Sequence, residues 1–395
     1  MSPAPIVAHQ GEFVRATLIN FAFFLSFNAF VLLPLHIQEL GGTEIEVGVV
    51  MGLYSAVGIV SQPIIGPWVD AIGRRLFMVA GTSLVVAAAL LAAIFDSIPV
   101  LASVRVLQGF GFSAYFVAMF SYVVDLVAPA QRGWALGIYG VSGFAATAFA
   151  PLLGELVVRR AGFRVLFALS AVLAVVPLVM VLRLRDPRSP RGMGAPAPGW
   201  LRAGLGDVLQ RHMIVTFFFG LGSGTLFAFL PTFAQSLAVA GLSLFYTAYA
   251  ASAIAVRIFG GRLIDTRGRR AVIVPSMFLQ MIGPALLAVI GYAITRTSTT
   301  PVVPILFLAG LVSGAAHGFL YPGLAALVTD VTPAAQRASA VAVFSAMFLL
   351  GQSVGAFVFG GVAHGLGYAS MWTIVTMLLL MGSALSMRLP RAPAS

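Results

Sequence analysis

Two short segments of the sequence share one pattern of glycine, acid and arginine. Residues 66–75 read G-P-W-V-D-A-I-G-R-R, and residues 261–270 read G-R-L-I-D-T-R-G-R-R. Five positions match at an offset of 195: Gly66, Asp70, Gly73, Arg74 and Arg75 correspond to Gly261, Asp265, Gly268, Arg269 and Arg270. Both segments lie between long apolar runs. Glycine permits a tight turn and the charges cannot enter lipid, so the pattern predicts a short helix–helix loop at a membrane face, once in each half of the chain.

The composition agrees with a membrane protein. Of 395 residues, 60% are hydrophobic and only 9% are charged, whereas a soluble domain is about half apolar and about a quarter charged. About 20 apolar residues cross a bilayer once. The apolar runs predict twelve spans, at 13–34, 46–69, 76–95, 99–124, 134–157, 163–183, 212–236, 242–263, 271–294, 303–329, 338–362 and 367–388.

The arginines predict which side the loops face. All 23 basic residues are arginine; with the amino terminus inside, 17 fall in inner segments, four in outer loops and two within spans. This bias predicts that both termini are cytoplasmic. It also explains the net charge of +11 by topology, so nucleic-acid binding is not expected. No cysteine is present, which excludes disulfides and thiolate metal sites.

A second repeat supports an internal duplication. Residues 125–132 read D-L-V-A-P-A-Q-R and residues 330–337 read D-V-T-P-A-A-Q-R, at an offset of 205. Between the halves, a segment rich in proline, glycine and arginine is typical of a linker, and its later part suits a short interfacial helix. The predicted units are residues 1–183, a cytoplasmic linker at 184–211, and residues 212–395.

The doubled loop resembles the loop motif of the major facilitator superfamily, which lies between its second and third and again between its eighth and ninth transmembrane helices. The resemblance implies an all-α membrane fold of twelve helices in two pseudo-symmetric six-helix bundles, with the substrate bound between them. It implies a monomeric secondary transporter in a bacterial inner membrane, working by alternating access without a cofactor or metal.

The resemblance also implies a charge relay at the inner face. Its members are Asp70, Arg74 and Asp125 in the first half, and Asp265, Arg269 and Asp330 in the second. Such contacts hold the inner face closed in one state and break in the other. The alternative is that these charges only fix topology; acids beside the arginines favour the relay, because topology needs arginines alone.

Arg105, Gln108, Gly109 and Gly111 resemble the fourth-helix motif that the superfamily associates with proton coupling. Arg105 lies roughly 9 Å inside the outer end of its span, so it needs a partner or a wet cavity unless it snorkels to the surface. Glu46 is a possible partner. Many proton antiporters carry an acid in the first span, where this chain offers only Asn20 and Asn28.

His317 is the deepest titratable side chain, 13 residues from both Pro304 and Asp330. A histidine in the cavity could carry a proton, because its charge changes near neutral pH. The alternative is a neutral histidine hydrogen-bonded between helices. Arg257, near the inner end of its span, is expected to snorkel or to join the relay.

The fifth span resembles the glycine-rich motif of superfamily exporters. It carries Gly143, Pro151 and Gly154, with alanine in place of the glycine before Pro151. The alternative is close packing of small residues, which membrane helices use widely.

These features together predict a proton-coupled exporter of a small, amphipathic organic molecule. The alternative is a symporter or facilitator that imports a small polar nutrient. A membrane enzyme is not expected, because the sequence holds no nucleophile–base constellation, phosphate loop or metal-ligand cluster; a non-transporting receptor is the other remote alternative.

Overall fold

The computed structural model describes residues 10–127, 132–184, 210–239, 241–294, 302–332 and 337–390. These residues are helical and contain no β-strand. Ten helices among them are long and apolar enough to cross a membrane. The predicted interfacial helix in the linker lies outside the described residues.

The first half contains six α-helices and one 3₁₀ turn. They are α1 (Gln10–Phe27), the turn η1 (Asn28–Leu32), α2 (Leu33–Glu39), α3 (Glu44–Ile72), α4 (Arg74–Ile94), α5 (Ile98–Asp125) and α6 (Arg132–Leu182). The second half contains α8 (Arg211–Ser236), α9 (Ser243–Ala255), the π-helix η3 (Val256–Gly260), α10 (Gly261–Thr266), α11 (Arg269–Ile294), α12 (Val302–Val331) and α13 (Arg337–Ser386).

Glycines in the left-handed region end the helices where the repeat predicted turns. Gly73, with φ of 113°, separates α3 from α4, and Gly268, with φ of 83°, precedes α11. Only glycine adopts such angles without steric cost. We call the end of the bundle that holds these glycines the inner face, and the opposite end the outer face.

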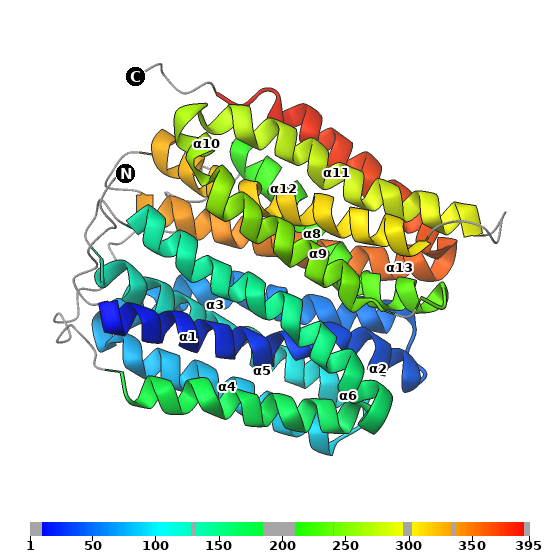
Figure 1. Cartoon of the computed structure of the whole chain (residues 1–395), viewed down its shortest axis with the longest axis horizontal. Coiled ribbons are helices and arrows are strands. Elements are labelled where there is room, and N and C mark those ends of the chain that lie inside the picture. Colours follow the sequence, from blue (N-terminus) through cyan, green and yellow to red (C-terminus); the bar gives the residue numbers. More distant parts are fainter. Residues whose placement is uncertain are drawn as a thin grey trace.

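Two of the ten helices are too long for one crossing. A straight helix of the 51 residues of α6 would measure ~76 Å, against ~30 Å of hydrocarbon. Each long helix contains one glycine with a non-helical backbone, Gly162 in α6 and Gly367 in α13, with φ of 80° and 77°. Figure 1 shows that α6 and α13 each turn back on themselves, so each is a hairpin of two helical arms. The two glycines are 205 residues apart, the offset of the second sequence repeat.

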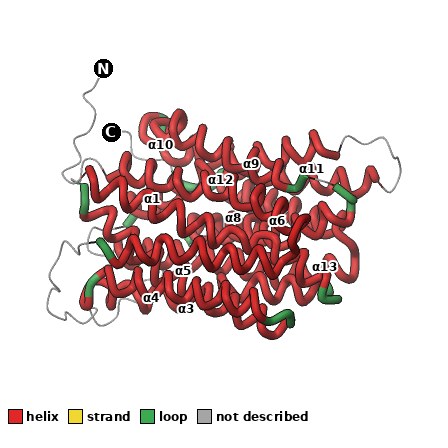
Figure 2. The backbone as a smooth tube through the Cα atoms, turned by 60° about the horizontal axis from the view of Figure 1, so that its bottom comes forward, coloured by secondary structure: helices red, strands yellow, loops and turns green. Residues whose placement is uncertain are grey.

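The helices pack in two groups. In the first half α1 packs on α6, and α4 packs on both α5 and α6. In the second half α8 and α11 pack on α13, and α9 and α11 pack on α12. The main contacts between the groups are α3 with α13 and α6 with α9. The long axes of the helices in both groups are roughly aligned, parallel or antiparallel to one another (Figures 1 and 2).

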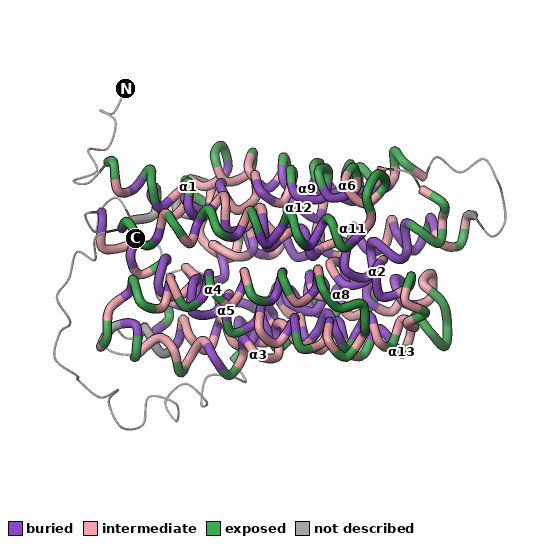
Figure 3. Tube along the Cα trace, turned by 90° about the horizontal axis from the view of Figure 1, so that it is seen from below, coloured by how far each residue is buried: buried purple, intermediate pink, exposed green. Residues whose placement is uncertain are grey.

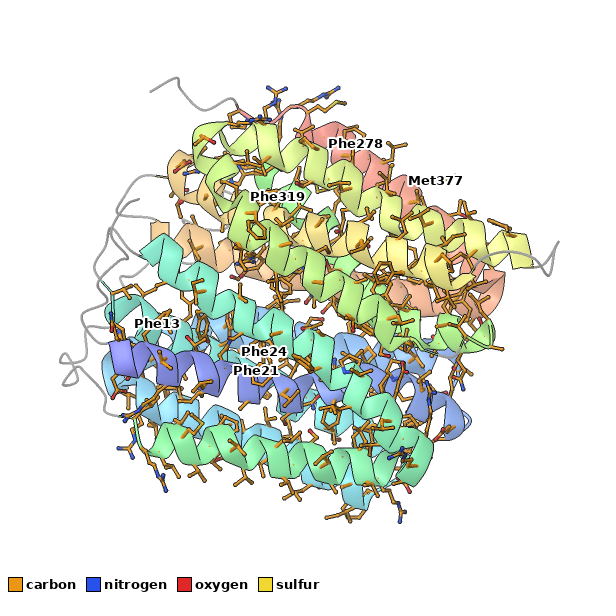
Figure 4. All side chains as sticks on the ribbon, viewed as in Figure 1. Phe13, Phe21, Phe24, Phe278, Phe319 and Met377 are labelled. Atoms are coloured by element: carbon orange, nitrogen blue, oxygen red, sulfur yellow. The ribbon has the colours of Figure 1, made fainter. Side chains whose placement is uncertain are left out.

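The bundle exposes apolar side chains on its outside. Exposed residues lie along the outer sides of the tubes and buried ones between them (Figure 3). Phe259 is 83% exposed and Met377, labelled in Figure 4, is 60% exposed. A soluble protein does not leave so much large apolar surface uncovered, so these helix faces contact lipid.

Candidate functional site

Each half carries one arginine–aspartate ion pair at the inner face. Nη2 of Arg74 lies 2.5 Å from Oδ2 of Asp125, and both side chains are more than nine-tenths buried. Nε of Arg269 lies 2.9 Å from Oδ2 of Asp330, whose side chain is about half exposed. The structure therefore brings together two of the three predicted relay members in each half. The side chains of the third members, Asp70 and Asp265, lie outside the described part of the chain.

The second arginine of each loop ties the loop to the end of a hairpin. Arg75 donates to the carbonyl of Leu182 at the end of α6, and Arg270 donates to the carbonyl of Met387 just after α13. The sequence reasoning matched these arginines between the repeats but did not find their partners. Backbone carbonyls left free at a helix end are natural acceptors for arginine.

The first glycine of each repeated loop, Gly66 or Gly261, has no close neighbour at the position of a side chain. Gly66 and Gly261 lie inside helices, and a Cβ built on either one would meet nothing within 4 Å. Steric room therefore does not explain why glycine stands there.

The outer face carries polar contacts between the halves that the sequence reasoning missed. Nδ1 of His364 lies 3.1 Å from Oε2 of Glu44. The backbone N–H of Ser243 donates to Oε1 of Glu155 at 2.6 Å, and its hydroxyl donates to Oε2 at 3.3 Å. Glu155 therefore holds the start of α9 to α6.

Glycines bring α3 and α13 together behind these contacts. A Cβ on Gly48 would lie 2.5 Å from the carbonyl oxygen of Ala356, and one on Gly360 would lie 2.6 Å from that of Glu44. One helical turn further in, Ser353 donates to Ser55 at 3.1 Å. Backbones approach this closely only where side chains are small.

Arg105 is held inside the first half. It is 5% exposed, which argues against snorkelling to the surface. Its Nη1 donates to Oε1 of Gln108 at 2.8 Å, and its guanidinium lies 5.0 Å from the ring centroid of Tyr54. The pairing with Glu46 is not found among the described contacts. Glu46 instead caps α3, accepting from the backbone N–H of Thr43 at 2.8 Å, as a capping box requires.

His317 lies in a cluster of aromatic rings at the middle of α12. Five rings surround it with centroids 5.0–6.4 Å away, and we call the six residues the central aromatic cluster: Phe144, Phe219, Tyr249, His317, Tyr321 and Phe348. Phe144 comes from α6 and the other five come from the second half. Nδ1 of His317 is buried without a hydrogen-bond partner among the described residues. Any hydrogen bond of this histidine between helices would therefore have to use Nε2.

Arg257 also reaches this cluster, contrary to the expectation that it snorkels. Its guanidinium lies 5.4 Å from the ring centroid of Phe144, across the boundary between the halves. The room comes from Gly140, where a Cβ would lie 3.1 Å from Nη1 of Arg257. Nε of Arg257 is buried without a hydrogen-bond partner among the described residues.

Asn28 and the fifth-span glycines join α1, η1 and α6. Asn28 donates to Oγ1 of Thr147 at 3.0 Å. A Cβ on Gly143 would touch Phe24, which Figure 4 labels on α1, and one on Gly154 would lie 2.9 Å from Leu32. These two glycines thus lie where α6 packs against α1 and η1. Pro151 lies buried in α6 between them.

Comparison with known proteins decides the family. The model of the Major Facilitator Superfamily matches residues 16–212 and again residues 212–395. The chain belongs to the major facilitator superfamily. Membership in this superfamily agrees with the ten described helices that are long and apolar enough to cross a membrane.

Curated superfamily relatives match parts of the chain. The inner membrane transport protein YajR of Escherichia coli is 28% identical over 46% of this chain and 39% of its own length. The chloramphenicol resistance protein of Pseudomonas aeruginosa is 27% identical over 65% of this chain and 62% of its own length. The alignments therefore span about two fifths to three fifths of these relatives.

The fold extends over nearly the whole chain. The crystal structure of the nucleoside transporter NupG covers 95% of this chain and 98% of its own, with a TM-score of 0.74 and 16% sequence identity. At this identity the likeness establishes the fold alone.

Proposed function

We propose that the protein is a monomeric secondary transporter whose chain crosses a bacterial inner membrane twelve times with both termini in the cytoplasm. The count follows if each arm of the α6 and α13 hairpins is one crossing. The two six-helix halves are then residues 1–183 and 212–395, joined by a linker at 184–211. The 17-to-4 division of arginines between inner and outer segments supports this orientation.

The observation that carries alternating access is the difference between the two faces. At the outer face, Glu44 with His364 and Glu155 with Ser243 connect the halves. At the inner face, the described ion pairs each stay within one half, Arg74 with Asp125 and Arg269 with Asp330. Such a molecule is closed outward, and it opens outward when the polar contacts at the outer face separate.

Proton-coupled export of a small amphipathic molecule is the direction we favour. A relative confers chloramphenicol resistance by its printed name, and resistance of this kind suits export. Arg105 with Gln108 reproduces the fourth-helix motif, and the central aromatic cluster offers apolar surface between the halves. His317 is the member of the central aromatic cluster whose charge ordinarily changes near neutral pH, and it would take the proton.

Transport in membrane vesicles of both orientations tests the proposal. The probes are chloramphenicol and three naphthalene compounds that differ mainly in charge: naphthalenesulfonate, naphthalenesulfonamide and naphthylmethylammonium. We expect at least one probe to accumulate in inside-out vesicles whose interior is acid, and not in vesicles lacking the protein. Accumulation in right-side-out vesicles together with protons would establish the import symporter instead.

The histidine has its own test. In His317→Gln we expect the rate of the transported probe to lose its dependence on pH, because the side chain can no longer take up a proton. The control is His36→Gln, which removes a histidine at the outer end of α2 near Asp96. A variant at position 317 that keeps both rate and pH profile would make that histidine structural.

A further inference from the structure

All acidic side chains of this chain lie near the ends of helices or in the linker. The sequence has 12 of them: Glu12, Glu39, Glu44, Glu46, Asp70, Asp96, Asp125, Glu155, Asp186, Asp207, Asp265 and Asp330. None falls near the middle of a membrane-crossing helix. Two arginines, Arg105 and Arg257, do lie inside membrane-crossing segments away from the helix ends. Among the described side chains, no carboxylate forms an ion pair with either arginine, so the charge they carry there is positive.

Arg257 is the less satisfied of the two cations. Counting ~1.5 Å per residue, it lies roughly 20 Å from the start of α9 and about 13 Å from the end of α10, and the residue is partly buried. No ion pair of the described side chains involves Arg257. Its Nε has no hydrogen-bond partner among the described residues, which is also true of Nε of Arg105. Arg105 has at least the amide oxygen of Gln108.

A cation held inside a membrane bundle without a counter-charge costs free energy, and natural membrane helices keep one where it meets a partner during function. Arg257 stands at the boundary between the halves, against Phe144 of α6, which also packs on His317. A guanidinium without a described acidic partner therefore lies beside an aromatic surface. A guanidinium offers a planar pair of donors that matches a carboxylate or sulfonate.

The backbone of Arg257 is also unusual. It lies in the π-helix η3, and such single π-turns occur frequently at functional sites because they re-aim side chains. Gly260 of the same turn packs against Phe319, which Figure 4 labels, where a Cβ would lie 2.7 Å from the ring. This contact fixes η3 on α12, the helix that carries His317.

We propose that the transported substrate is an organic anion with an aromatic or similarly flat apolar body. Its anionic group binds Arg257, and its ring enters the central aromatic cluster. This inference rests on the proposed transport function and names the substrate class of that site. Organic cations are disfavoured because the site already holds uncompensated positive charge and no acid to receive another.

Binding to the purified full-length protein in detergent tests the substrate class. The probes are naphthalenesulfonate, naphthalenesulfonamide and naphthylmethylammonium, read by the shift in thermal unfolding over a concentration series, since a ligand that binds the folded form raises the midpoint. We expect the sulfonate to bind more tightly than the sulfonamide by roughly tenfold or more, and the ammonium compound to be weakest. Equal binding of all three, tighter binding of the ammonium compound, or no shift with the sulfonate would overturn the proposal.

Variants at position 257 assign the anion to this arginine. We expect Arg257→Met to lose the preference for the sulfonate over the sulfonamide, and Arg257→Lys to keep part of it. The free Arg257→Met protein should unfold at a higher temperature than the wild type, because it no longer buries an unmatched charge. The control is Arg160→Gln, which removes an exposed arginine near the outer end of the first arm of α6.

The outcomes separate this inference from the transport function. If the vesicles transport a neutral or cationic probe while the sulfonate neither binds nor competes, the transporter stands and the anion site falls. If Arg257→Met keeps the sulfonate preference with full stability, Arg257 is not the anchor. If the sulfonate binds through Arg257 and no probe crosses the membrane, the anion site stands and the transport proposal fails.

Discussion

At the scale of single residues, the two inner-face ion pairs occupy equivalent places but different environments. Arg74 and Asp125 are 8% and 9% exposed, whereas Arg269 and Asp330 are 21% and 49% exposed. A buried charge that loses its partner is costly, while an exposed pair contributes little. The first half therefore depends more on its pair than the second.

This difference predicts unequal effects of matched substitutions. Arg74→Ala should lower the stability of the folded protein by about 3 kcal/mol, because Asp125 then remains buried without this partner. Arg269→Ala should cost at most about 1 kcal/mol. Thermal unfolding of the detergent-solubilised variants measures both, and equal shifts would show that burial does not distinguish the pairs.

The same variants test the relay. We expect Arg74→Ala to cut transport severalfold while the amount of protein in the membrane stays normal. The reason is that the Arg74–Asp125 ion pair, which would hold the inner face closed in one state, is lost. Unchanged flux in a variant that inserts normally would leave the inner-face charges with topology as their only role.

Residue positions were predictable where a motif fixes them and not elsewhere. The pairing of Arg74 with Asp125 and of Arg269 with Asp330 was implied by the resemblance of the doubled loop to the superfamily motif. Arg257 was misplaced because a lone arginine in an apolar run looks the same whether it faces lipid or the interior. The π-helix adds a residue to its turn, so the regular helical period could not assign its face.

At the scale of helices, the two long hairpins show how little chain a turn needs. The predicted spans ended at 157 and 362 and resumed at 163 and 367, which implied outer loops of several residues. In the structure the helix continues almost unbroken, and one glycine with positive φ reverses the chain in each case, Gly162 and Gly367. Hydropathy identifies an apolar segment, but it does not predict whether the backbone at the end of that segment is helical.

Adjacent glycines in α13 offer a matched test of the α3–α13 contact. Gly360→Leu should reduce transport severalfold, because its side chain would meet the backbone of Glu44 and Ile45 and keep the outer face from closing. Gly361→Leu is the control, since a Cβ there meets nothing within 4 Å. Flux in vesicles measures both variants, and equal rates would show that this close approach is not required for the cycle.

At the scale of the whole molecule, the outer-face contacts must separate in every cycle. The chain has no cysteine, so the double variant Glu155→Cys, Ser243→Cys carries only the introduced pair. Oxidation or a short thiol cross-linker should stop transport by holding α6 to α9, and a reductant should restore it. The two single variants are the controls; full-rate transport by the cross-linked protein would contradict alternating access through this face.

The two-half arrangement of the fold could be predicted from the sequence, because two separate sequence repeats indicate an internal duplication. Offsets of 195 and 205 recur in the structure as paired contacts, Arg75 with Leu182 and Arg270 with Met387, and as the hairpin glycines. The cross-half contacts were not accessible. Glu155 with Ser243 and Arg257 with Phe144 join positions that share no motif and no repeat, so only packing reveals them.

The absence of acids in the middle of the bundle has an electrical consequence. Bacterial cytoplasm is negative relative to the exterior, and one elementary charge crossing 100 mV changes free energy by about 2.3 kcal/mol. An anion leaving the cell on Arg257 moves down that voltage, so expulsion would continue with the pH difference dissipated and would stop when a potassium ionophore clamps the potential at zero.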